Sequence, residues 1–118
     1  MLMFVRGIRG ATTVKQNERQ EMLQATKELL LRLMEANQVL VKDIASIIFT
    51  VTQDLTAEFP AVAARELGWN DTPLLCSCEI NVPKSLPKCI RILLLVNTNL
   101  SQEEIKHVYL NEAVNLRR

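Results

Sequence analysis

Two charged residues in apolar segments are the strongest candidates for chemistry in this chain. Arg91 interrupts the run CIRILLLV at 89–96, and Glu79 lies in the preceding apolar segment LLCSCEINV at 74–82. Burying either charge is costly unless an opposite charge or a ligand pairs with it. An arginine suits carboxylates, because its guanidinium donates two parallel hydrogen bonds and stays charged at any working pH. The two residues therefore predict either a structural ion pair or a site for an anionic molecule.

Alternation along the two segments predicts how these charges meet. If both segments are strands, Arg91 shares a face with Leu93, and Glu79 lies on the face opposite Cys76. A short loop joins the segments, so we expect them to pair as a hairpin that brings Arg91 and Glu79 together on one face. An ion pair at a sheet edge, or an arginine whose head reaches water, is the simpler interpretation of that arrangement. Arg9, near the amino end, can equally be an edge-strand charge that discourages aggregation.

The other chemistry-bearing residues form weaker patterns. Four soft ligands for zinc are present, namely Cys76, Cys78, Cys89 and His107. Their C-x-C spacing departs from the C-x₂₋₄-C spacing of structural zinc sites, so buried inert cysteines are the favoured interpretation. No motif arranges a serine or a carboxylate around His107, and the sequence has neither a P-loop nor a dinucleotide fingerprint.

Composition limits the class of protein. The 118 residues suffice for one domain, which we expect to span 1–118. Hydrophobic residues make up 48% and aromatic residues 4%, so the core must be aliphatic, and some apolar surface is expected to be buried against other subunits. A formal charge of +1 argues against nucleic-acid binding. Without a signal-peptide pattern or a membrane-length apolar run, the three cysteines indicate a cytoplasmic protein with reduced thiols and no membrane partner.

The elements that must position these residues predict an α+β fold. We expect a long helix from an N-cap at Asn17, with Gln20 in the capping-box position, to Asn37. Strands are expected at 1–13, 44–51, 74–82, 89–96 and within 105–116, and short helices at 60–67 and from 101. Gly7 and Gly10 inside the first strand indicate a bulge or a place where another backbone or a ligand comes close. The result is a single domain in which the long helix covers one face of a mixed β-sheet.

Five segments together resemble one protein family. They are RGIRGATTV at 6–14, FPAVAAREL at 59–67, CSCEI at 76–80, KCIRILLLV at 88–96 and HVYLNEAVNLR at 107–117. In this order and with nearly this spacing they are similar to the monofunctional chorismate mutases of the Bacillus type. The resemblance implies a homotrimer built as a trimeric pseudo-α/β-barrel, with active sites in the clefts between subunits. It also implies the rearrangement of chorismate to prephenate in phenylalanine and tyrosine biosynthesis, with no cofactor and no metal.

The resemblance further implies a role for individual residues. Arg91 is expected to reach the ether oxygen of the substrate, Arg9 to bind a carboxylate, and Glu79 to accept from the ring hydroxyl. The remaining expected contacts are Cys76 beside that hydroxyl, Tyr109 at the side-chain carboxylate, Phe59, Ala61 and Arg65 from the neighbouring subunit, and Leu116 and Arg117 covering the pocket.

Such a reaction fits a chain without a catalytic triad. A unimolecular pericyclic rearrangement needs no nucleophile and moves no proton. A site accelerates it by holding the flexible dianion in its reactive chair form, which recovers orientational entropy. Fixed charge placed against the charge that develops as the ether C–O bond breaks contributes further, and arginines suit both tasks.

The sequence is compatible with two other functions. One is a non-catalytic trimer that binds an anionic metabolite at its subunit clefts, since a fold does not specify a function. Glu79 distinguishes this binding function from the rearrangement, because binding a dianion requires no carboxylate in the pocket. The other is an imine or enamine deaminase of a similarly built trimeric family, which would need a water-activating group for which the sequence shows no motif.

Overall fold

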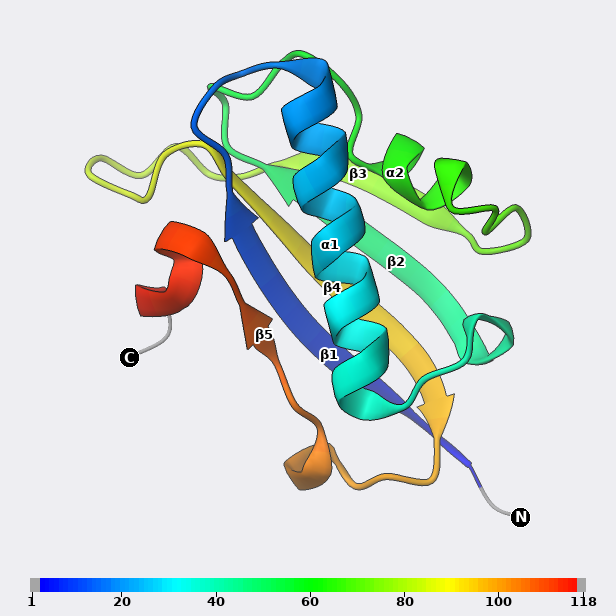
Figure 1. Ribbon diagram of the computed structural model, residues 1–118. Coiled ribbons are helices and arrows are strands. Elements are labelled where there is room, and N and C mark those ends of the chain that lie inside the picture. Colours follow the sequence, from blue (N-terminus) through cyan, green and yellow to red (C-terminus); the bar gives the residue numbers. More distant parts are fainter. Residues whose placement is uncertain (1–2, 117–118) are drawn as a thin grey trace.

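A long helix lies diagonally across a five-stranded sheet in the computed structural model, which describes residues 3–116 (Figure 1). The strands are β1 (Phe4–Thr13), β2 (Ile44–Val51), β3 (Leu74–Cys78), β4 (Cys89–Thr98) and β5 (Val108–Tyr109). The helices are α1 (Arg19–Asn37) and α2 (Ala61–Glu66), with 3₁₀ turns η1 (Val41–Asp43), η2 (Gln102–Glu104) and η3 (Asn111–Asn115). This confirms a single α+β domain with a mixed sheet.

The strand order β3-β2-β4-β1-β5 differs from the predicted hairpin. β4 is the central strand and runs antiparallel to both β1 and β2, while β2 and β3 are parallel. The expected pairing of β3 with β4 is therefore wrong, because β2 lies between them. The physical reason is the connection through α2, since a strand–helix–strand crossover returns its second strand parallel to the first. β4 takes the centre because its residues facing α1, Ile90, Ile92, Leu94 and Val96, are all apolar and buried.

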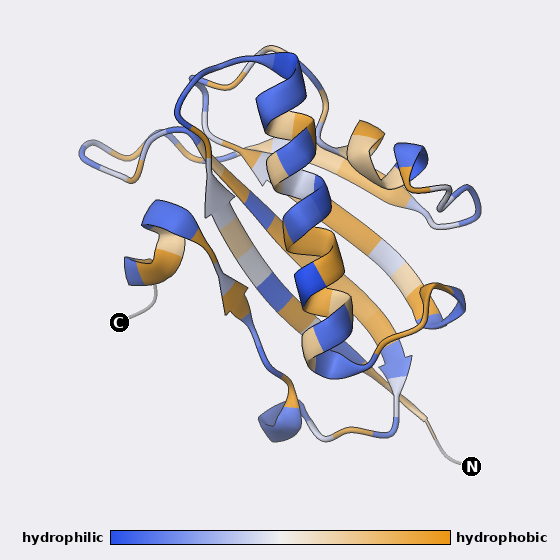
Figure 2. Cartoon of the chain, in the orientation of Figure 1, coloured by the Kyte–Doolittle hydropathy of each residue, from blue (hydrophilic) through white to orange (hydrophobic). Residues whose placement is uncertain are grey.

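Helix α1 packs through one buried stripe onto the sheet. The buried residues of α1 are Met22, Leu23, Thr26, Leu29, Leu30, Leu33 and Asn37. Their recurrence at three- and four-residue spacing is the amphipathic pattern on which the helix was predicted. Hydrophobic residues of β2 and β4 run beneath it in Figure 2, and together with α2 they form the main core.

The start of α1 lies one residue beyond the prediction. Glu18, not Asn17, is the N-cap, and its carboxylate accepts from the backbone N–H groups of Gln20 and Glu21. Gln20 therefore has no capping-box role. The Asn17 amide is used elsewhere: its oxygen accepts from the N–H groups of a separate loop, at Thr56 and Ala57. A carboxylate at the cap also suits the positive end of the helix dipole.

Three other boundaries can be compared with the structure. β3 ends at Cys78 rather than at residue 82, because its partner β2 ends at Val51, whose carbonyl accepts from the Glu79 N–H. In the segment 105–116 only the short β5 is strand, followed by η3. The short helix expected from 101 is η2, which begins with a capping box between Ser101 and Glu104, and Gly68, with φ of 87°, follows α2.

The two faces of the sheet have different surroundings. Both helices cover one face. The open face, defined here by Val5, Ile48, Leu75, Leu93 and Leu95, carries partly or fully exposed apolar side chains. Among residues 3–116, a cluster of Ala11, Cys89 and Ala113 of η3 covers the end of this face near the start of β4. No helix within residues 3–116 is long and apolar enough to cross a membrane.

Close packing of α1 against β1 explains why residue 10 is a glycine. A Cβ at Gly10 would lie 3.0 Å from Cδ1 of Leu33 and 3.1 Å from Cδ1 of Leu29, so glycine lets α1 lie close to β1. A Cβ at Gly7 would be 3.5 Å from Leu93, an ordinary contact. Neither glycine forms a bulge, because β1 pairs with β4 without a register shift. Gly10 is therefore closely approached, but by helix side chains and not by the backbone or ligand that was predicted.

We expect Gly10→Val to lower the free energy of unfolding by about 1–3 kcal/mol, because the added carbons would overpack the contact between α1 and β1. The measurement is denaturant unfolding at fixed protein concentration. Gly7→Val is the matched control, since it adds the same atoms on the open face, and a smaller loss is expected. Equal losses in the two variants would contradict this account of α1 packing.

Candidate active site

Arg91 projects from the centre of the sheet onto the open face. Its cross-strand neighbours are Ala11 on β1 and Thr50 on β2, and Thr50 in turn neighbours Ser77 on β3. These four residues form one row across the sheet. The Arg91 side chain is 46% exposed, so its charge remains accessible from the open face. A central strand holds its backbone by hydrogen bonds on both sides, which gives the guanidinium a rigid base.

Glu79 lies beside Arg91, as predicted, although by a different route. Its Oε2 is 3.7 Å from Nε of Arg91, longer than the 2.7–2.9 Å of a tight charge-assisted hydrogen bond. A loose pair with one partner nearly half exposed contributes little to stability. Glu79 reaches this position from the end of β3 across β2, where the Thr50 hydroxyl donates to Oε2. β2 lies between β3 and β4, so Glu79 and Arg91 meet across β2 and not across a direct β3–β4 hairpin.

Four predicted site residues line one cavity of about 310 Å³ on the open face. They are Arg9, Arg91, Tyr109 and Leu116, and the same cavity is lined by Ile48 and Thr50. Two positive side chains from adjacent strands and one phenol thus surround a space that suits a small anion with several carboxylates. Arg117 lies outside the described residues. A larger cavity of about 780 Å³, between α1 and the loop before β4, is lined by none of the described site residues.

His107 has a structural contact that the sequence did not suggest. Its Nδ1 accepts from the backbone N–H of Arg9 at 2.9 Å. This bond lies directly before the short parallel pairing of β5 with β1. It helps to hold Tyr109 next to Arg9, and no sequence motif around His107 could have indicated it.

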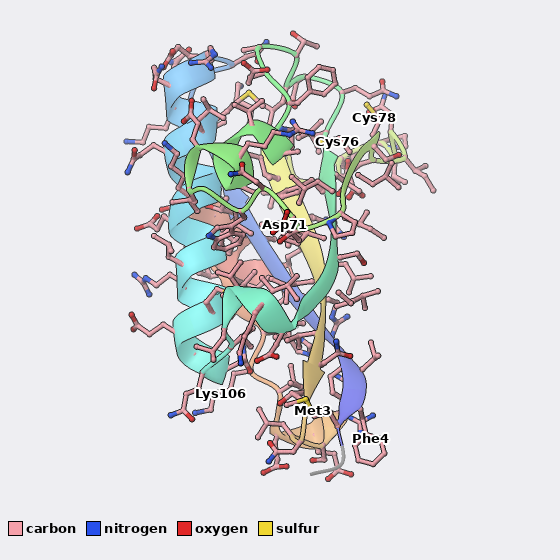
Figure 3. The ribbon with its side chains drawn as sticks, turned by 90° about the vertical axis from the view of Figure 1, so that its right-hand side faces the viewer. Met3, Phe4, Asp71, Cys76, Cys78 and Lys106 are labelled. Carbon is pink, nitrogen blue, oxygen red and sulfur yellow. The ribbon has the colours of Figure 1, made fainter. Side chains whose placement is uncertain are left out.

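The remaining predicted site residues form a second group near α2. Phe59 and Cys76 line a cavity of about 400 Å³, with Ala61 and Arg65 on the adjoining helix. Burial raises the pKa of the Cys76 thiol, against the opposing effects of a hydrogen bond with the Ala61 backbone and of the Arg65 charge. Cys76 is the cross-strand neighbour of Phe49, which is fully buried in the main core, so it faces the helices and not the open face. Figure 3 shows it near Cys78, at the end of the molecule opposite Met3 and Phe4.

The loop that carries Phe59 is held by Asn17, just before α1, and by Arg19, the first residue of α1. Asn17 Oδ1 accepts from the N–H groups of Thr56 and Ala57 at 2.9 and 3.0 Å, and Arg19 Nε is 2.7 Å from Oε2 of Glu58. A hydrogen bond from the Phe59 N–H, followed by the bond from Arg19, holds the pKa of Glu58 below its usual value. These contacts fix the loop while leaving Phe59 67% exposed.

A metal site is not assembled from the described part of the chain. Within residues 3–116, no three His, Cys, Asp or Glu side chains are grouped to hold an ion. Cys89 is buried under η3, and burial raises the pKa of its thiol. Cys76 lies on the other face of the sheet, which separates the thiols considered as zinc ligands.

Comparison with known proteins assigns the family. Residues 5–118 match the family model described as chorismate mutase type I. The chain belongs to the type I chorismate mutases. It is 53% identical over 115 residues to the chorismate mutase AroH of Thermus thermophilus, covering 97% of this chain and 94% of the relative. It is 46% identical over 116 residues to the chorismate mutase AroH of Bacillus subtilis (strain 168), with 98% and 91% covered.

A solved structure agrees with this assignment. The chain superposes on a chorismate mutase from Clostridium thermocellum with a TM-score of 0.90 at 54% identity, covering 91% of this chain and 96% of that one. The resemblance that the five sequence segments predicted is confirmed, and the type I chorismate mutase family places the chain among the isomerases.

We expect Asn17→Ala to speed amide hydrogen exchange at Thr56 and Ala57 by about 5- to 10-fold, because each amide loses its acceptor. Asn17→Asp keeps an acceptor oxygen at the same position and should leave both rates near those of the unmodified chain. Two-dimensional NMR of the exchanging protein measures the difference, with the Leu29 amide inside α1 as an internal reference. Identical exchange in the two variants would show that Asn17 does not hold this loop.

Proposed function

We propose that the chain rearranges chorismate to prephenate in a pocket shared by two subunits of a homotrimer. The activity rests on the family match and on the two curated relatives, each aligned over more than nine tenths of both chains. The observation that carries the proposed site is the cavity that brings Arg9, Arg91 and Tyr109 together, with Glu79 beside Arg91.

The reaction chemistry divides between these charged groups. Arg9 and Tyr109 bind the substrate carboxylates and hold the molecule in the chair form from which it reacts. Arg91 donates to the ether oxygen, where negative charge grows as the C–O bond lengthens ahead of C–C bond formation. Glu79 accepts from the ring hydroxyl and balances the positive charge of the allyl fragment. No proton transfer is required of any side chain, which agrees with a site whose two arginines stay charged at any working pH.

The separation of the predicted residues into two groups supports a shared pocket. Arg91 is on the open face, whereas Cys76 is on the face covered by the helices, so the sheet lies between them within one protomer. A neighbouring subunit would bring Cys76 together with Phe59, Ala61 and Arg65. The exposed apolar residues of the open face, such as Val5 and Leu93, provide surface for that subunit to bury.

Glu79 favours catalysis over simple binding of an anionic metabolite. A carboxylate 3.7 Å from the central arginine weakens attraction for a dianion, so a pure binding site gains nothing from it. A rearrangement that develops positive charge on one fragment is accelerated by a nearby carboxylate, which stabilises that charge. A cytoplasmic location is part of the proposal, supported by the free thiols of Cys76, Cys78 and Cys89.

We expect the purified protein to consume chorismate, and Arg91→Ala to lower kcat by at least about 10³-fold through the loss of charge at the ether oxygen. The loss of chorismate ultraviolet absorbance measures both. Arg91→Lys should recover only part of the rate, because one ammonium cannot reproduce the two-pronged contact. An unmodified protein no faster than the uncatalysed reaction would refute the activity. Full activity with a neutral citrulline at position 91 would refute the electrostatic role.

Mixing two inactive variants tests the shared pocket. Arg91→Ala damages the open-face group, and Phe59→Asp adds a repelling charge to the α2 group. In a cyclic trimer that contains both kinds of subunit, about one pocket in three combines two undamaged groups. Co-refolded mixtures should therefore regain activity that neither variant shows alone, and native mass spectrometry should find mixed trimers. A monomeric protein, or inactive mixed trimers, would contradict a pocket built by two subunits.

A further inference from the structure

We propose that Thr50 is a positioning residue that keeps Glu79 from closing onto Arg91. The inference rests on the proposed function, in which both charged residues face the substrate. Thr50 is the cross-strand neighbour of Arg91 on one side and of Ser77 on the other. Its side chain therefore lies between the strand that carries Arg91 and the strand that leads into Glu79, and it lines the same cavity as Arg9 and Arg91.

The Thr50 hydroxyl bonds to the Glu79 oxygen that lies nearest to Arg91. The Thr50 hydroxyl donates to Oε2 of Glu79, the same oxygen that lies 3.7 Å from Nε of Arg91. The direction of the bond follows from chemistry, because an ionised carboxylate only accepts. Hydrogen bonds to an ionised acceptor are about twice as strong as neutral ones, so this contact can hold a flexible side chain in one position.

Without that bond, the two charges would be free to pair directly. The Glu79 backbone is fixed by its N–H bond to the Val51 carbonyl, but its side chain has three rotatable bonds. Free of Thr50, the carboxylate could shorten its distance to Arg91 to the 2.7–2.9 Å of a charge-assisted bond. A guanidinium so paired would have to break that contact to meet the substrate. The Thr50 hydroxyl thus keeps Arg91 and Glu79 from pairing with each other, so that both can contact the transition state.

The backbone of β2 makes Thr50 a rigid anchor. β2 has hydrogen-bonded neighbours on both sides, β3 and β4, so its residues cannot move independently of the sheet. A β-branched side chain also has few rotamers open to it in a strand. Both restraints limit the motion of the donor oxygen and, through it, of the Glu79 carboxylate.

The test compares Thr50→Val, which keeps the shape and removes the hydroxyl, with Thr50→Ser, which keeps the hydroxyl. We expect kcat of Thr50→Val to fall by about 10- to 100-fold, the worth of one hydrogen bond to a charged group, with a smaller change in KM. Thr50→Ser should stay within about threefold of the unmodified enzyme. Ser46→Ala removes a hydroxyl from the same face of the same strand and should leave kcat unchanged. Circular dichroism and native mass establish that each variant is folded and assembled.

A double-mutant cycle separates positioning from general stability. If Thr50 acts through Glu79, Thr50→Val should cost far less in a Glu79→Gln background than in the unmodified enzyme. Additive losses, or equal losses in the Val and Ser variants, would overturn the inference. Should Thr50→Val fail to fold, Thr50→Ala provides the same comparison with less bulk. An unmodified protein without activity refutes the proposed function itself, whereas an active protein with a fully active Thr50→Val refutes only the role of Thr50.

Discussion

The alternation of side chains along β4 is the constraint on which the rest of the structure depends. Its residues facing α1 are apolar and buried, and they make β4 the central strand of the sheet. The alternate residues, Arg91 among them, must then point to the opposite face, because successive side chains of a strand point in opposite directions. A charge that no core could accept is thereby held rigidly on the face that the helices leave open. Preorganised charge of this kind is what an electrostatic site requires, since no energy is spent on reorienting it during the reaction.

The same two-sided sheet makes function depend on assembly in the proposed mechanism. One group of site residues surrounds Arg91 on the open face, and the other surrounds Phe59 and Cys76 beside α2. The apolar side chains of the open face, including Leu93, are exposed in the single chain, and another subunit of the proposed trimer would cover them. A single packing event would then bury that surface and complete the pocket. The rearrangement needs only position and charge, so rigid groups from two subunits suffice for it.

Much of this fold was predictable because local patterns and tertiary packing agree. The apolar stripe of α1, the β-branched run of β2 and the alternating β4 each match an element of the structure. The predictions that were wrong concern residues or strands that can pair locally but pair with a distant segment in the folded chain. Asn17 is a good N-cap by type, yet its amide holds the loop at Thr56 and leaves the cap to Glu18. The short loop before β4 suggested a hairpin, but the crossover through α2 placed β2 between the two strands.

What the sequence by itself determined is the identity of the family, the class of fold and the residues that carry charge. Local propensity, periodicity and motif spacing encode these properties, and they require no knowledge of distant contacts. Only the tertiary structure decided which residues meet. It placed Thr50 between Arg91 and Glu79, and it brought Cys76 to the same cavity as Phe59, from the loop before α2. Strand order determines such neighbours, and strand order depends on how distant segments share one core. For that reason a threonine that looked like an ordinary strand residue became visible as part of the site only in the folded chain.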